Sequence, residues 1–195
     1  MEKSRYPAVF LDRDGVLTIE RKRISMPDEV ELYEGVAEAV RDIHRMGYFV
    51  IVTTNQSGIA RGLFSEEEIR QLHDRLKAET GVDEIYYCPH HIDGKIEKYR
   101  INCNCRKPKI GMIEQAMSDF PIDINHSWMV GDRETDIQFG KNAGIRTVLV
   151  RTGYGEETLK KNIDYDDIVD DIWDFVRLIR KNDNEQSIEG TRKEI

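Results

Sequence analysis

The chain has 195 residues, with 29 Lys and Arg against 37 Asp and Glu, so its formal net charge is −8. This length predicts one domain, at about 100–200 residues per domain, and the 39% hydrophobic content suits a folded protein with a core. The negative charge argues against a nucleic-acid binder, which needs a positive field facing phosphates. The apolar runs are far shorter than the ~20 residues that span a bilayer, and the first residues show no apolar signal-peptide region. We expect a cytoplasmic protein with no nucleic-acid or membrane partner.

Short apolar runs alternate with amphipathic stretches, a pattern typical of a parallel sheet covered by helices. It predicts an α/β fold, a three-layer Rossmann-like parallel sheet with helices on both faces. We expect strands at residues 8–11, 48–52, 85–87, 128–130 and 147–150. We expect the last helix at about 165–180, where an apolar stripe comprises Ile168, Ile172, Phe175, Val176 and Ile179. The prediction is a single domain over 1–180, followed by a polar, disordered tail at 181–195.

The three cysteines all lie between positions 88 and 105, which is a tighter cluster than random placement favours. Cys88-x-His90 and Cys103-x-Cys105 together offer three thiolates and one imidazole, a full tetrahedral set for a structural zinc ion. His91 is a competing ligand, and three unligated cysteines are the alternative. An odd number of cysteines without a signal peptide also favours the reducing cytoplasm.

Polar residues follow the predicted strands, where ligands of parallel α/β sheets bind. Asp12 and Asp14 follow the first strand and point the same way, because they are two residues apart on an extended chain. Converging carboxylates repel unless a cation or a shared proton relieves them. The other clusters comprise Thr54-Asn55-Gln56-Ser57-Gly58 with Arg61, the basic pair Arg106-Lys107, and Gly131-Asp132-Arg133 with Asp136. Each cluster alone could be an ordinary loop, but their order on successive strand ends is informative.

Asp12-Arg13-Asp14-Gly15-Val16-Leu17, Thr54-Asn55-Gln56, Lys107 and Gly131-Asp132 with Asp136 resemble the four motifs of the haloacid dehalogenase superfamily of phosphotransferases. The resemblance covers about residues 8–152. Within the superfamily, residues 54–62, Cys88-Pro89-His90-His91 and residues 103–108 are similar to the D-glycero-D-manno-heptose 1,7-bisphosphate 7-phosphatases and their histidinol-phosphatase relatives. This resemblance implies a minimal cap, a zinc loop at 88–105 in which His90, and not His91, is the fourth ligand, and a Mg²⁺-dependent phosphatase.

The resemblance also implies residue roles. Asp12 would attack phosphorus as the nucleophile and form an aspartyl-phosphate, and Asp14 would be the general acid and base. Mg²⁺ would be held by Asp12, the Asp14 backbone carbonyl and Asp132, while Lys107 and Thr54 would screen the phosphoryl oxygens. The substrate-binding candidates are Asn55, Gln56, Ser57, Arg61, Arg106 and Arg133.

The segment after the first motif departs from the family pattern. Heptose phosphatases commonly carry a Gly-Tyr-containing loop there, whereas this chain has the basic triplet Arg21-Lys22-Arg23. Arg21 and Arg23 are candidates to bind a second phosphate or an acidic group, although a solvated face is the usual role of a charge run.

We therefore expect a phosphatase that acts on a sugar bisphosphate, a small-molecule phosphate ester, with Mg²⁺ as catalytic and Zn²⁺ as structural cofactor. Histidinol phosphate is the alternative substrate. A polynucleotide 3′-phosphatase and an inert zinc-binding interaction module are further alternatives. A minimal cap leaves no large apolar patch, so a monomer is expected.

Overall fold

The computed structural model describes residues 4–21 and 26–193, and its core is one six-stranded parallel sheet. The strand order is β3-β2-β1-β4-β5-β6, and every neighbouring pair is parallel. This is the Rossmann order, in which the chain changes direction beside β1. The strands are β1 (Ala8–Leu11), β2 (Phe49–Asn55), β3 (Glu84–Cys88), β4 (Trp128–Gly131), β5 (Arg146–Val150) and β6 (Asp167–Val169).

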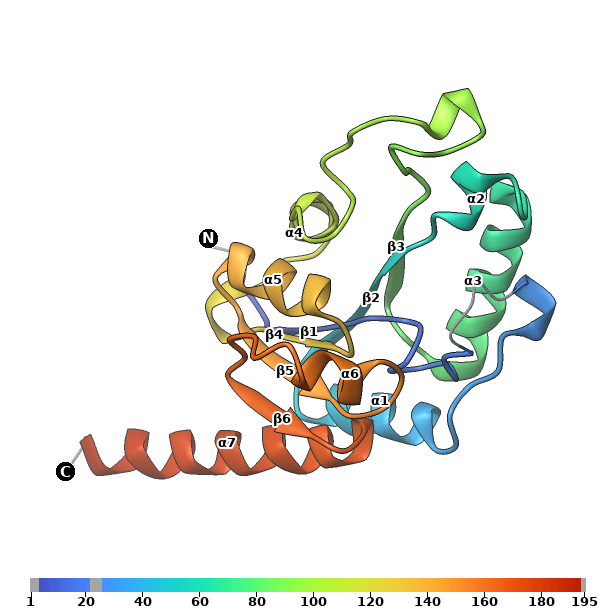
Figure 1. Ribbon diagram of the computed structural model, residues 1–195. Coiled ribbons are helices and arrows are strands. Elements are labelled where there is room, and N and C mark those ends of the chain that lie inside the picture. The colour runs from blue at the N-terminus through green and yellow to red at the C-terminus, as the bar shows by residue number, and fades with distance from the viewer. Residues whose placement is uncertain (1–3, 22–25, 194–195) are drawn as a thin grey trace.

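Helices cover both faces of the sheet and complete the three predicted layers (Figure 1). One face carries α1 (Val36–Arg45), α3 (Glu66–Thr80) and α7 (Ile172–Lys193). The other carries α4 (Gly111–Asp119) and α5 (Glu134–Ala143). Two short helices lie near the strand ends, α2 (Gly58–Arg61) and α6 (Gly155–Leu159), and three 3-10 turns are η1 (Pro27–Glu29), η2 (Glu97–Tyr99) and η3 (Ile124–His126).

The central strand β1 shows why the sheet needs cover on both sides. All four of its residues are fully buried. Val9 and Leu11 pack in the core under α1, α3 and α7, whereas Ala8 and Phe10 pack in the core under α4 and α5. Successive side chains of a strand point to opposite faces, so a continuous apolar run produces two cores.

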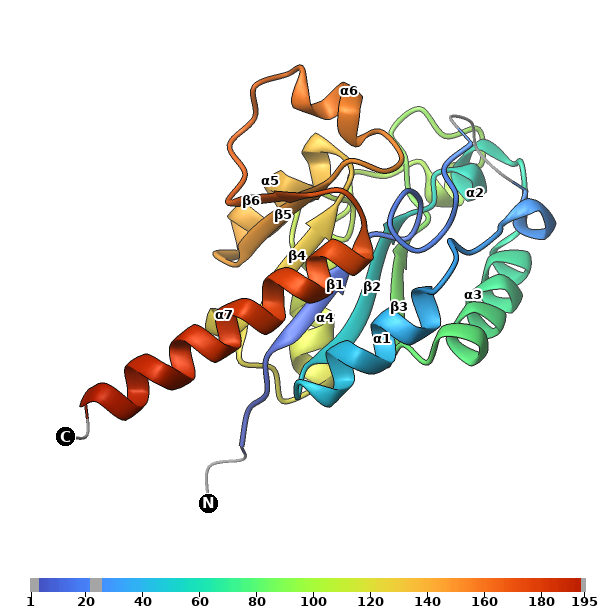
Figure 2. The ribbon, with the colours of Figure 1, turned by 90° about the horizontal axis from the view of Figure 1, so that it is seen from below.

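The C-terminal region differs from the prediction in two ways. Ile168, which was counted in the stripe of the last helix, lies in the edge strand β6, and α7 begins only at Ile172. Residues 181–193, predicted as a disordered tail, continue α7 away from the sheet (Figure 2). The continuation has tertiary anchors: Tyr48 Oη donates to Asp183 at 2.8 Å and Arg146 Nη1 donates to Asn182 at 3.0 Å. Such contacts with distant segments are not visible in local composition.

The neighbours β1 and β4 position the site. Leu11 lies opposite Val130 in their register, so both strands end at the same edge of the sheet. The residues that follow them therefore meet at the point where the strand order reverses, where ligands bind in this fold. Among the described residues, no helix is both long and apolar enough to cross a membrane.

Candidate active site

A buried cluster, called here the floor of the site, comprises Asp12, Lys107, Asp132 and Asp136. Lys107 lies at its centre, between two of the carboxylates. Asp12 follows β1, where its N–H donates to the Val130 carbonyl at 2.9 Å. Lys107 Nζ lies 2.8 Å from Asp12 Oδ1 and 2.6 Å from Asp136 Oδ1, and it donates to the Thr53 carbonyl at 2.7 Å. The lysine thus joins the segment after β1 to β2 and to the first turn of α5.

Asp132 follows β4 and lies beside Asp12 and Asp136. Its Oδ2 accepts from the Tyr154 N–H at 2.7 Å, whereas its Oδ1 is buried and has no hydrogen-bond partner within the described part of the chain. Gly15 and Gly153 press against the carboxylate: both have positive φ, and a Cβ on either would lie 2.2–2.3 Å from Asp132 Oδ2. Only glycine allows the backbone to approach so closely in that conformation.

The charges of the floor do not balance without a cation. Burial raises the pKa of Asp12 to about 7, even though Lys107 opposes the shift. Burial, together with the negative charges of Asp12 and Asp136, raises the pKa of Asp132 to about 8. Burial would lower the pKa of Lys107, but its two carboxylates raise it above the usual value. Oxygen ligands from Asp12, Asp132 and Asp136 come within 4.8 Å of one another, so this donor set fits a hard divalent cation such as Mg²⁺.

The raised pKa values predict a pH dependence of stability in the Mg²⁺-free protein. The folded state binds protons to Asp12 and Asp132 more tightly than the unfolded chain does, so these two groups reduce its stability as pH rises toward 8. His73 acts in the opposite sense but only below pH 6.5, because burial lowers its pKa to about 3. From pH 6.5 to 8 the two carboxyl groups lower the free energy of unfolding by about 2 kcal/mol. Cys105, whose pKa its hydrogen bond with Cys88 lowers to about 5, acts in the opposite sense over the same range. The measurement is therefore the difference in Tm between variant and wild type in thermal scans.

Added Mg²⁺ should remove most of the contribution of the two carboxyl groups. Without metal, the Tm of D132N minus that of the wild type should rise from pH 6.5 to 8, whereas D74N, at an exposed position on α3, should show the wild-type pH dependence. A D132N difference that is constant or falls from pH 6.5 to 8 would contradict the charge arrangement described here.

Asp14 lies beside the floor in a cage of donors. Its carboxylate accepts three hydrogen bonds from the Arg13 guanidinium, at 2.8–3.1 Å, and further bonds from Thr18 and Gln56, both at 3.1 Å. Burial would raise the pKa of Asp14, but the Arg13 charge and these hydrogen bonds lower it below its usual value. The neutral ring of His73 lies 3.4 Å from Arg13 Nη1 and accepts from it, which orients the guanidinium.

The polar side chains of the loop after β2 have two roles: some line the cavity, and one holds the segment that carries Lys107. Gln56 Nε2 donates to Thr54 Oγ1 at 2.8 Å, and this hydroxyl lines the cavity above the floor. The Lys107 N–H donates to Asn55 Oδ1 at 3.1 Å, and Asn55 Nδ2 donates to the Lys107 carbonyl at 3.3 Å. The amide therefore holds the lysine segment in place, and Ser57 lies at the start of α2 on the cavity wall.

A cavity of about 380 Å³ opens above the floor. Four arginines line it: Arg13, which pairs with Asp14, and Arg61, Arg106 and Arg133. Arg133 stacks on the Tyr154 ring at 3.8 Å and pairs with the nearly buried Glu20 carboxylate at 3.1 Å. The wall of the cavity therefore carries several arginine cations, the Glu20 carboxylate and the aromatic face of Tyr154.

The basic triplet contributes little to this cavity in the described structure. Arg21 pairs with Glu31 at 3.0 Å on the surface and does not line the cavity. Lys22 and Arg23 lie outside the described residues. The structure thus brings together the predicted residues of the four motifs and leaves Arg21 apart from them.

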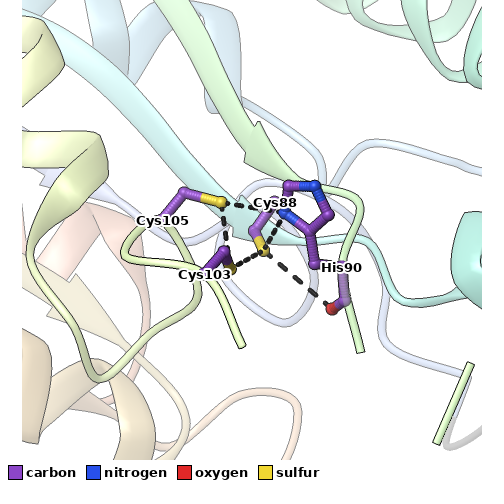
Figure 3. A group of neighbouring side chains, drawn as sticks. All are labelled: Cys88, His90, Cys103 and Cys105. Carbon is purple, nitrogen blue, oxygen red and sulfur yellow. Dashed lines mark hydrogen bonds between the residues drawn. The ribbon is translucent and has the colours of Figure 1, made fainter. Parts of the chain in front are cut away.

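The cysteine and histidine side chains converge beside this site, between β3 and α4 (Figure 3). Sγ atoms lie 3.5 Å apart for Cys88 and Cys103 and 3.3 Å apart for Cys103 and Cys105, and His90 Nδ1 lies 3.3 Å from Cys105 Sγ. Zn–S bonds of about 2.3 Å in a tetrahedron give ligand separations of roughly 3.5–3.8 Å. The four donors therefore fit one zinc ion, and the ring of His91 makes its contacts elsewhere.

Six cavity residues were not among the predicted catalytic, binding or metal residues: Arg13, Glu20, Gly58, Thr135, Asp136 and Tyr154. Asp136 carried a signal as the last motif residue, but its ion pair with Lys107 depends on tertiary structure. Tyr154 follows β5, so the rule that ligands bind beyond strand ends would have found it. Glu20 precedes a charge run and has no distinguishing local pattern.

The comparisons with known proteins agree with this geometry. A family model described as HAD-hyrolase-like matches residues 104–175. The D-glycero-β-D-manno-heptose-1,7-bisphosphate 7-phosphatase of Pasteurella multocida is 46% identical over 180 residues, which are 89% of this chain and 96% of that protein. The chain belongs to this family of haloacid dehalogenase-like phosphatases.

Further relatives of the family agree in sequence and in structure. The enzyme of the same name from Haemophilus influenzae is 42% identical over 89% of this chain and 97% of its own length. The crystal structure of the D,D-heptose 1,7-bisphosphate phosphatase from B. bronchiseptica, complexed with magnesium and phosphate, matches with a TM-score of 0.78. It is 31% identical, over 90% of this chain and 99% of that one. The predicted superfamily and the three-layer fold are therefore confirmed.

Proposed function

We propose that this chain is a Mg²⁺-dependent phosphatase that hydrolyses the 7-phosphate of D-glycero-D-manno-heptose 1,7-bisphosphate. One observation carries the proposal: the buried floor, with Asp12, Lys107 and Asp132, lies under a cavity lined by four arginines, in a chain that matches heptose bisphosphate phosphatases over nearly their whole length. The relatives are named for the β anomer, so that anomer is the first substrate to assay.

The geometry supports a double-displacement mechanism at the floor. Asp12 Oδ2 attacks phosphorus while the sugar oxygen leaves, and Asp14 gives that oxygen its proton. Asp14 then takes a proton from water, which attacks the aspartyl-phosphate and releases inorganic phosphate. The Arg13 fork favours the ionised form of Asp14, which is the form that this second step needs.

Other residues around the floor would offset the negative charge of the phosphoryl group. Lys107 and the Thr54 hydroxyl would face the oxygens of the transferred phosphoryl group, where a fixed ammonium offsets the repulsion between carboxylate and phosphate. Mg²⁺, held by Asp12, Asp132 and the Asp14 carbonyl, would supply further charge neutralisation for the phosphate. The orphaned Asp132 Oδ1 is the observation that favours this site.

Zinc is proposed as the structural metal of the loop at 88–105. Three free thiols in one cluster suit a reducing compartment, so we place the protein in the cytoplasm. We further propose that it is a monomer without nucleic-acid or membrane partners. Size-exclusion chromatography with light scattering tests the oligomeric state.

Phosphate release tests the function directly. We expect kcat/KM with Mg²⁺ for heptose 1,7-bisphosphate to exceed that for histidinol phosphate and for a 3′-phosphorylated oligonucleotide at least tenfold. Histidinol phosphate presents no second anion to the arginine-lined cavity, and a chain of net charge −8 repels a polyanionic oligonucleotide. Preference for histidinol phosphate would keep the mechanism but replace the substrate. Inactivity on all three, with Mg²⁺ bound, would contradict the proposal.

A further inference from the structure

Two cavity-side segments hold Arg61 and His91 against each other. Arg61 ends α2 and lines the cavity, and His91 lies on the loop that follows β3. The loop is fixed on α2 by a hydrogen bond from the Ile96 N–H to the Ala60 carbonyl at 2.9 Å. Arg61 Nη2 and His91 Nε2 consequently lie 3.3 Å apart.

This contact joins two donors. The backbone N–H of Asp93 donates to His91 Nδ1 at 3.1 Å, so Nδ1 carries a lone pair and the ring proton is on Nε2. An arginine has N–H donors only. Arg61 Nη2 and His91 Nε2 therefore cannot bond to each other, although they lie within hydrogen-bond distance.

The same arginine has a second unmet donor. Its Nε is buried and has no hydrogen-bond partner among the described residues. A buried donor without an acceptor is costly, so a group that accepts from Nε, Nη2 and His91 Nε2 would relieve all three. Phosphate oxygens form such an acceptor, since a guanidinium binds them with two parallel bonds.

The surroundings of the pair favour an anion. Arg106 stands nearby, where its Nη1 donates to the His90 carbonyl at 3.2 Å, and it lines the same cavity as Arg61. The Asp93 carboxylate lies on the Nδ1 side of the ring, at 3.8 Å, and is 79% exposed to solvent. The Nε2 side, where a ligand would bind, thus faces arginines.

We propose that Arg61 and His91 form the subsite for the phosphate that is not transferred, at the mouth of the cavity whose floor holds Asp12. The inference rests on the proposed function. It moves the second-phosphate role, which the sequence suggested for Arg21 and Arg23, to residues that meet in space only through the fold of the zinc loop on α2.

The test compares two substrates that differ only in this phosphate, heptose 1,7-bisphosphate and heptose 7-phosphate. For R61Q and for H91L we expect kcat/KM to fall at least tenfold more on the bisphosphate than on the monophosphate, mainly through KM. H91Q keeps an N–H donor near the position of Nε2 and should retain more of the selectivity than H91L. R100A, an exposed arginine on the same loop, should change neither value.

The outcomes separate the two proposals. Equal losses on both substrates in R61Q and H91L, from a wild type that prefers the bisphosphate, overturn the subsite and leave the function intact. A wild type with no preference overturns the bisphosphatase function and the subsite together. Zinc content and circular dichroism identify a misfolded variant, and each variant is compared with the wild type separately, so one folded variant is enough to decide.

Discussion

Asp12→Asn is expected to reduce kcat by at least ~10⁴-fold, because the amide cannot form the aspartyl-phosphate. The fold should survive the change. Asn Oδ1 still accepts from Lys107 Nζ, and the lysine keeps its ion pair with Asp136. The substitution also removes a carboxyl group whose pKa burial raises to about 7, so the Tm at pH 8 should not fall.

Steady-state phosphate release and a thermal scan measure both effects. D74N, at an exposed position on α3, is the matched control and should keep wild-type kcat. Asp14→Asn should instead allow some phosphoryl transfer but block its hydrolysis, so intact-protein mass spectrometry should detect a phosphorylated chain that D12N never shows. A D12N protein that retains a tenth or more of wild-type kcat would rule out the nucleophile assignment.

Cys103→Ser is expected to lower bound zinc from about one ion per chain to well under one, because a hydroxyl is a far poorer ligand than a thiolate. The segment that the metal orders carries His91 and leads directly to Arg106. Lys107 has independent anchors in Asn55, Asp12 and Asp136. We therefore expect KM for the bisphosphate to rise more than kcat falls, with a loss in kcat/KM of roughly 10–100-fold.

Asn104→Ala is the matched control, because Asn104 stands between two candidate ligands and its exposed side chain donates to Glu114 on the surface. It should retain full zinc and nearly full activity. Metal analysis, limited proteolysis within 89–105 and the two kinetic constants decide the result. Wild-type protein purified without chelator that holds well below one zinc per chain would contradict the zinc site, as would a C103S protein with unchanged metal and kinetics.

In the C-terminal region, the secondary structure predicted from the local sequence pattern differs from the structure. A stripe of apolar residues at helical spacing predicted one helix from about 165, yet the chain first adds the edge strand β6. Val150 of β5 pairs with Val169, so the partner strand decided the conformation of this short segment. The helix then continues past 180, where Asp183 meets Tyr48. Both outcomes depend on residues far away in the chain.

Much of the candidate site could be predicted because its residues follow strands. Parallel strands place their carboxyl ends at one edge, so Asp12 and Asp132 had to be neighbours once β1 and β4 paired. The zinc ligands were predictable for another reason, since their short Cys-x-His and Cys-x-Cys spacings leave little conformational freedom. The sequence placed Asn55 at the cavity but did not predict its role. Its hydrogen bonds to the Lys107 backbone join segments that are 52 residues apart.

By itself the amino-acid sequence determined the fold class and predicted the candidate catalytic carboxylates and metal ligands, because alternation, strand-end position and spacing are local properties. Only the tertiary structure decided which charges meet. It places Lys107 between Asp12 and Asp136 and pairs Asp14 with Arg13. It also brings the N–H donors of Arg61 and His91 within 3.3 Å of each other. Ion pairs and unmet hydrogen bonds are properties of pairs of atoms within a few ångströms, and the chain brings those atoms together only when its helices pack on the sheet.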